Sequence, residues 1–185
     1  MRMWSKSILS IYRYLETLSN AIDGLVKKNS KLTTGRGYNS TYIQASKIIE
    51  WTEKKRKMIN LKIATREALK QLPLTDRRIL ILFYIDGVKS SVIAELLGCS
   101  IRTYYRKKVD AIERFGLALG RVGFDMDYLN KNYLQEKWLM SVYDRCIIQD
   151  SVSADSAVLK TDKSVVKDII KDLGKIKCYA FSTYV

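Results

Sequence analysis

The sequence contains no histidine, one proline and three cysteines among its 185 residues. Without histidine, neither a Ser-His-Asp triad nor a Cys-His pair can form, and a common nitrogen ligand of zinc is missing. Cys99, Cys146 and Cys178 are odd in number and follow no metal-ligand spacing, so we expect free thiols in the reducing cytoplasm. A phosphate loop of the form G-x-x-x-x-G-K-[ST] is also missing. These absences predict a protein that is not an enzyme and needs no metal or other cofactor.

Long apolar runs are missing as well. No stretch of about 18 apolar residues occurs, so the sequence predicts no membrane span. The first segment, MRMWSKSILSIY, lacks a continuous apolar core and a small-residue cleavage site, so we expect no secretion signal. Asp125 and Asp127 form a D-x-D pair that a divalent metal could use, but we interpret Asp125 as a helix N-cap and Asp127 as an acid that complements the helix dipole.

Acidic residues are scarce relative to basic ones: 19 Asp and Glu stand against 33 Lys and Arg, a net charge of +14. The excess is uneven along the chain. Residues 1–72 hold 15 basic against 5 acidic residues, residues 73–124 hold 9 against 5, and residues 125–185 hold 9 against 9. A basic excess in the first two thirds indicates a polyanionic partner such as nucleic acid, whereas simple solubilisation is the alternative.

Apolar residues recur at three- and four-residue steps along most of the chain, which predicts an all-α fold. Residues 5–28 are expected to form one helix and residues 41–71 a second. The loop 30–40 allows the two to fold back as an antiparallel hairpin. The inner face expected for the second helix consists of Ile43, Ile48, Ile49, Met58, Ile59, Ile63, Ala64, Ala68 and Leu69, with Tyr42 and Trp51 also in the hairpin core.

The run EKKRK at residues 53–57 lies in the middle of this second helix. A solvated helix face is one interpretation of the run, and contact with DNA phosphates is the other. Trp51 and Leu61 lie off the main apolar stripe, so the hairpin needs a further apolar partner surface. We expect a second copy of the chain to supply it, which would place two recognition helices about 34 Å apart on DNA. A C-terminal helix around Trp138 is the alternative.

The apolar spacing within residues 72–115 predicts three helices separated by two short breaks. The residues expected to cap their starts are, in chain order, Thr75 or Asp76, Ser90 or Ser91, and Ser100. Asp86-Gly87 ends the first helix, and Gly98 ends the second because glycine tolerates a positive φ. The glycine-rich segment 116–124 is expected to end the third helix. The core expected for this module is Leu80, Phe83, Ile93, Leu96, Tyr104 and Ile112.

Two helices joined by a tight glycine-containing turn form a helix-turn-helix, whose second helix enters the DNA major groove. The alternative is a three-helix piece of a larger core with a solvated basic face. The candidate DNA-binding residues are Lys89, Ser90, Ser100, Arg102, Thr103, Tyr105, Arg106, Lys107 and Lys108. We expect Arg102, Tyr105 and Arg106 to contact base edges, because Arg can bind guanine O6 and N7 as a fork. Lys89 and Ser90 would hold a phosphate, and Thr103, Lys107 and Lys108 would lie on or near the DNA backbone.

The segments LPLTDRRILILFYIDG and SSVIAELLGCSIRTYYRKKVDAI resemble region 4 of sigma-70-type factors. The residues that carry the resemblance are Leu72, Pro73, Arg78, Leu80, Ile93, Ala94, Leu97, Gly98, Ser100, Thr103 and Ala111. The pattern S-x-x-T-Y-Y-R-x-K is similar to small phage-encoded regulators of the ArpU and RinA type. Lys108 departs from the family, which often has a buried leucine there. The resemblance implies that Tyr104 is buried and that Tyr105 is on the DNA side.

Beyond residue 124 we expect helices at 126–148 and 163–174, the latter capped by Asp162. The polar segment 149–161 would link them, and the last residues would pack as an edge strand or remain free. The predicted organisation is therefore a basic helical hairpin (1–71), a sigma-region-4-like helix-turn-helix module (72–124) and a C-terminal helical extension (125–185).

This organisation predicts a sequence-specific, DNA-binding transcriptional regulator encoded by a phage or mobile element. Its partners would be double-stranded DNA, RNA polymerase and a second copy of the chain, with no membrane. The alternatives are a small sigma-like factor, a DNA-packaging adaptor similar to a small terminase subunit, and a plain protein-interaction module.

Overall fold

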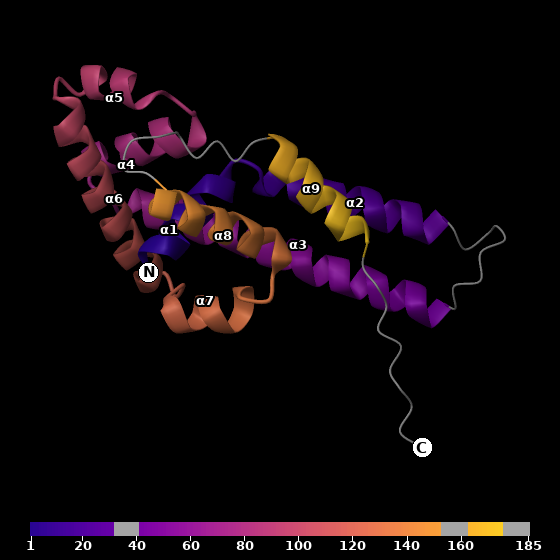
Figure 1. The fold of residues 1–185 in the computed structure, drawn as a ribbon. Coiled ribbons are helices and arrows are strands. Elements are labelled where there is room, and N and C mark those ends of the chain that lie inside the picture. The colour runs from indigo at the N-terminus through magenta and orange to yellow at the C-terminus, as the bar shows by residue number, and fades with distance from the viewer. Residues whose placement is uncertain (32–40, 153–162, 176–185) are drawn as a thin grey trace.

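The computed structural model describes residues 1–31, 41–152 and 163–175, and within these ranges the chain is helical with no strand, which confirms the all-α expectation (Figure 1). The elements in chain order are α1 (Arg2–Tyr12), α2 (Leu15–Lys31), α3 (Thr41–Lys70), α4 (Leu74–Leu80), the π-helical η2 (Ile81–Ile85), α5 (Ser90–Leu96), α6 (Ile101–Arg121), α7 (Met126–Tyr133), α8 (Lys137–Val152) and α9 (Lys163–Gly174). None of these helices is long and apolar enough to cross a membrane.

The first predicted helix is two helices, so the expectation of one helix over residues 5–28 is wrong. The chain turns between Ile11 and Leu15, where the Tyr14 amide donates to the Ile11 carbonyl at 2.8 Å. Both Ile11 and Leu15 are buried, which kept the apolar pattern continuous across the break. The two helices bury different partners, because α1 packs against α6 and α8 whereas α2 lies along α3. One straight helix could not reach both surfaces.

The antiparallel hairpin of α2 and α3 is present as predicted, but the inner face assigned to α3 is partly wrong. Ile49, Ile59 and Ile63 are 64%, 41% and 54% exposed, and Tyr42 is 69% exposed. The buried side of α3 consists of Gln44, Trp51, Met58, Leu61, Ala64, Thr65, Ala68 and Leu69. Apolar residues surround this helix on all sides, so the packing of its neighbours decides which side is covered.

The apolar residues of the hairpin that lie off its main stripe pack against other helices of the same chain. Helix α9 packs on α2, and the indole Nε1 of Trp51 donates to the Leu173 carbonyl of α9 at 3.0 Å. Helix α8 covers α1, and Trp4 lies against Tyr143 with ring centroids 4.9 Å apart. The apolar side of the hairpin therefore has the C-terminal helices as its partner surface.

The predicted helix 126–148 is also broken, at residues 134–136. The carboxylate of Glu136 is buried at this break, where it accepts hydrogen bonds from Lys57 Nζ at 2.6 Å and from Trp138 Nε1 at 2.9 Å. The bond from Trp138 is local, whereas the bond from Lys57 ties the break to the distant helix α3. Asp125 caps α7 as predicted, since its side chain accepts from the Tyr128 amide at 2.8 Å. Helix α8 extends to Val152, into the segment expected to be a linker.

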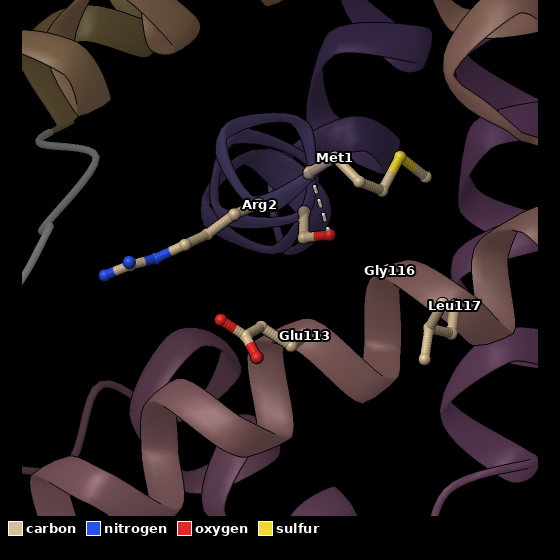
Figure 2. A pocket seen from close by; sticks show the side chains of 6 residues that line it. Met1, Arg2, Glu113, Gly116 and Leu117 are labelled. Atoms are coloured by element: carbon tan, nitrogen blue, oxygen red, sulfur yellow. Dashed lines mark hydrogen bonds between the residues drawn. The ribbon is translucent and has the colours of Figure 1, made fainter.

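Helix α6 ends at Arg121, within the glycine-rich segment 116–124 that was expected to end it, and Gly123 follows with a φ of +84°. Gly116 itself does not end the helix. Gly116 serves helix packing instead, as Figure 2 shows where α1 meets α6. A Cβ at this position would lie 2.9 Å from Ser5 Oγ and 3.0 Å from Met1 Cγ, so any larger residue would force the Ser5 and Met1 side chains to shift. The shallow pocket beside the contact is lined by Met1, Arg2, Ser5, Glu113, Gly116 and Leu117. The predictions for Asp162, for loop residues 32–40 and for the final segment concern residues outside the described ranges.

Candidate nucleic-acid interface

The helix-turn-helix begins with α4, which starts at Leu74 after Pro73 and has no side-chain cap. The prediction that Thr75 or Asp76 caps it is wrong, because the helix starts earlier and encloses both residues. Asp76 is instead 6% exposed, and its carboxylate accepts a hydrogen bond from Arg114 of α6. This pair raises the pKa of Arg114 through the hydrogen bond and the charge of Asp76. The first helix of the module is thereby fixed to the recognition helix.

The short helix α5 follows a turn at Gly87, whose φ is +71°. Its N-cap is Lys89 and no side chain caps it, so the cap predictions for Ser90 and Ser91 are wrong. Leu96 is 57% exposed, so its placement in the core is also wrong. A two-turn helix that packs on one side against η2 and α6 can bury only a narrow stripe, here Ile93 and Ala94.

The turn between α5 and α6 matches the prediction. Gly98 has a φ of +60°, and Ser100 caps α6 by accepting from the Thr103 amide at 3.2 Å. The side-chain oxygens of Ser100 and Thr103 also lie 2.9 Å apart. These bonds fix the start of α6, so the side chains of its first two turns project from a defined position.

The inner side of α6 is apolar. Tyr104, Ala111, Ile112 and Phe115 are fully buried, together with Leu80 and Ile93 of the preceding helices. Tyr105 is 39% exposed, which agrees with Tyr104 inside and Tyr105 outside. Burial raises the pKa of the Tyr104 hydroxyl to about 12, against an opposing effect of the Ser90 side chain. The neutral phenol is therefore the form that packs under the recognition helix.

Arg102 and Arg106 lie side by side on the outer face of α6, four residues apart, and both are exposed. Neither forms an ion pair with any residue in the part of the chain that the structure describes. Lys107 lies at the edge of this face and is half-buried. Asp110 and Glu113 follow on the outer side of the next turns, and Arg114 beside them is paired with Asp76.

Other candidate residues lie in different surroundings. Lys89 is exposed and Ser90 is half-buried at the start of α5. Lys108 is half-buried, and its Nζ lies 3.7 Å from the centre of the Phe83 ring and 5.3 Å from that of Tyr105. A cation over an aromatic face is an attractive contact, so Lys108 would have to leave Phe83 to reach a DNA phosphate. Sequence reasoning missed this contact and the Asp76–Arg114 pair, since both join residues far apart along the chain.

The basic run 53–57 of α3 differs from the start of α6 because all of its cations have acidic partners. The ion pairs are Lys54–Glu50, Lys55–Asp23, Arg56–Glu53 and Lys57–Glu136. Lys57 also donates to the Asn132 carbonyl at 2.9 Å. These contacts join α3 to α2 and to the α7–α8 break, so part of this charge is used to hold helices together.

This arrangement defines a helix-turn-helix: α5, a glycine turn and a capped recognition helix packed on α4. Residues 62–114 match the family model of sigma-70, region 4. The match begins inside the last turns of α3 and ends inside α6, so it covers less than a third of the chain. The chain thus carries a sigma-70 region 4-like helix-turn-helix. No curated protein and no solved structure matches it.

Proposed function

We propose that this chain is a sequence-specific, DNA-binding regulator of transcription that acts in the cytoplasm as a binding protein and not as an enzyme. Recognition helix α6 enters the major groove with its first two turns. The observation that carries the proposal is the exposed pair Arg102 and Arg106, which lacks acidic partners among the described residues and lies on a capped helix of a sigma-70 region 4-like module.

The side chains divide into two groups by their place on the module. Arg102 and Arg106 contact base edges, with Tyr105 beside them, because these residues lie on the outer face of α6. Lys89 and Lys107 contact phosphates at the two edges of the groove. Lys108 supports the helix from within through Phe83.

RNA polymerase is the second partner that we propose, because sigma-70 region 4 domains bind both DNA and the polymerase. The pattern S-x-x-T-Y-Y-R-x-K at residues 100–108 supports a regulator of the kind that phages and mobile elements encode. Copurification of the polymerase with the full chain, with and without promoter DNA, tests this partner directly. A polymerase that never copurifies contradicts it while leaving DNA binding intact.

Selection of bound sequences from a random duplex pool tests DNA recognition. We expect an enriched motif for the wild type and loss of that motif for the variant R102A/R106A. A variant with the same number of charges removed from α3, K47A/K54A, is the matched control and should recover the same motif as the wild type. Recovery of unenriched DNA would favour a packaging adaptor, and no recovery would favour a protein-interaction module.

A further inference from the structure

The outer face of α3 exposes large apolar side chains that no other helix in the described ranges covers. Tyr42, Ile49, Ile59 and Ile63 are 69%, 64%, 41% and 54% exposed. Single exposed apolar residues are common on protein surfaces and need no explanation. The spacing of these four residues along one helix therefore decides whether they form a packing surface.

The exposed side of α3 follows alternating steps of three and four residues. The positions on this line are Tyr42, Ala45, Ile49, Thr52, Arg56, Ile59, Ile63, Arg66 and Lys70, and every one of them is exposed. Such spacing is that of the a and d positions of a coiled coil, the positions through which two helices pack. We refer to these nine positions as the α3 seam. The hairpin partner α2 lies along α3 in Figure 1 and uses its buried side, so the seam is a second packing surface.

We propose that the α3 seam pairs with the α3 seam of a second copy of the chain, in the antiparallel direction. With a two-fold axis near residue 54, each a position faces a d position of the other helix. Ile49 then packs against the partner's Ile59, and Ala45 packs against the partner's Ile63. The symmetry repeats both layers on the other side of the axis, so four apolar layers flank a polar centre.

Charge selects the antiparallel direction. In a parallel pair in register, Arg56, Arg66 and Lys70 would each face the same cation of the other chain, which repels. In the antiparallel pair, Arg56 instead faces the partner's Thr52 and lies next to the partner's Glu53, so the guanidinium that already binds Glu53 in its own helix gains a second acid. Arg66 faces the ring of the partner's Tyr42, an arrangement that favours cation–π contact.

The pairing goes beyond the proposed function because it determines how far apart two recognition helices lie. Helix α6 packs at the C-terminal end of α3, next to α4 (Figure 1). From residue 54 to Lys70 the helix rises about 24 Å, so the two C-terminal ends lie about 48 Å apart. One turn of DNA is about 34 Å. The pairing therefore fixes the spacing of the half-sites that one dimer can bind, and the α3 ends that hold the two modules are already further apart than one turn.

Sedimentation equilibrium of the full chain at micromolar concentrations tests the pairing with two double variants. In I49E/I59E each Glu faces another Glu in the antiparallel pair, so we expect the wild-type mass of two chains to fall to one. In I49E/I59K each Glu faces a Lys of the other chain, so we expect the dimer to remain. A parallel pair would instead place Glu on Glu and Lys on Lys in this second variant and would dissociate.

The control is L134E/I147E, which places charge on two other exposed apolar residues, 53% and 46% exposed, outside α3. We expect it to remain dimeric, and circular dichroism should give the same helix content for every variant. A monomeric wild type, a dimeric I49E/I59E or a monomeric I49E/I59K would each overturn the proposal. DNA selection with the monomeric variant distinguishes the two proposals, since a single half-site should still be enriched if α6 recognises DNA.

Discussion

The chain has two clusters of positive charge on helices, residues 53–57 on α3 and residues 102–108 on α6, and the structure treats them differently. Within residues 53–57 each cation has an acidic partner, and two of these partners, Asp23 of α2 and Glu136 at the α7–α8 break, lie outside α3. On α6 the outward Arg102 and Arg106 have no ion pair within the described ranges. A run of like charges in a sequence is therefore not in itself a binding surface. The distribution of nearby acids decides between helix packing and availability to a ligand.

The largest effect should come from removing a cation that holds helices together. Lys57→Met removes the charge and leaves Trp138 as the one side-chain donor to the buried Glu136 carboxylate among the described residues. Leaving a buried charge uncompensated costs about 3 kcal/mol, so we expect a loss of unfolding free energy of that order in urea denaturation. DNA affinity of the folded variant should be unchanged. A loss of affinity without a loss of stability would reverse the roles assigned to the two clusters.

The next effect concerns the outward face of α6. Arg106→Ala should weaken binding to a selected duplex by roughly 1–3 kcal/mol and relax the preference at one base pair. Lys54→Ala is the matched control on α3, because its ion pair with Glu50 is local and Lys54 does not lie on the α3 seam. It should change neither affinity nor preference in a fluorescence anisotropy titration. Equal losses for Arg106→Ala on selected and random DNA would show that Arg106 contacts only the backbone.

The inner side of α6 should also make stability depend on alkaline pH. Tyr104 packs under α6 as a neutral phenol with its pKa raised by burial from 10.0 to about 12. The unfolded chain loses this proton above pH 10 while the folded chain keeps it to about pH 12, so stability falls by up to about 1.4 kcal/mol per pH unit in that window. Tyr104→Phe should lessen the fall without weakening the fold at pH 7. Urea midpoints at pH 7, 10 and 11 measure it, and an unchanged alkaline slope would contradict it.

The smallest effect should be that of Lys107→Ala. Lys107 lies at the edge of the outer face of α6, so we expect a phosphate contact and a modest, equal loss of affinity for all duplexes. The slope of log affinity against log salt should become less steep by about one. Titrations at several ionic strengths measure this slope. If the slope is unchanged while one base preference is lost, Lys107 contacts a base.

Local chemistry in the sequence was enough to predict several features. Gly98, Ser100 and the apolar spacing of α6 predict the turn, the cap and the buried side of the recognition helix, because each depends on neighbours within a few residues. The same holds for Asp125 at the start of α7. The resemblance to sigma-70 region 4 rests on the same local pattern. These interactions follow from the order of residues alone.

Tertiary structure decided what depends on distant partners. The breaks after Tyr12 and Tyr133 occur where α1, α2, α7 and α8 must reach different surfaces, and no local residue type marks them. Ile49 and Ile63 lie outside while Trp51 lies inside, because α2 and α9 cover only one side of α3. The spacing of apolar residues along a helix shows that the helix has a face to bury, but it does not show which element covers that face. Charged residues behave in the same way. The number of cations can be read from the sequence, but whether an acidic side chain lies near each of them depends on the tertiary fold.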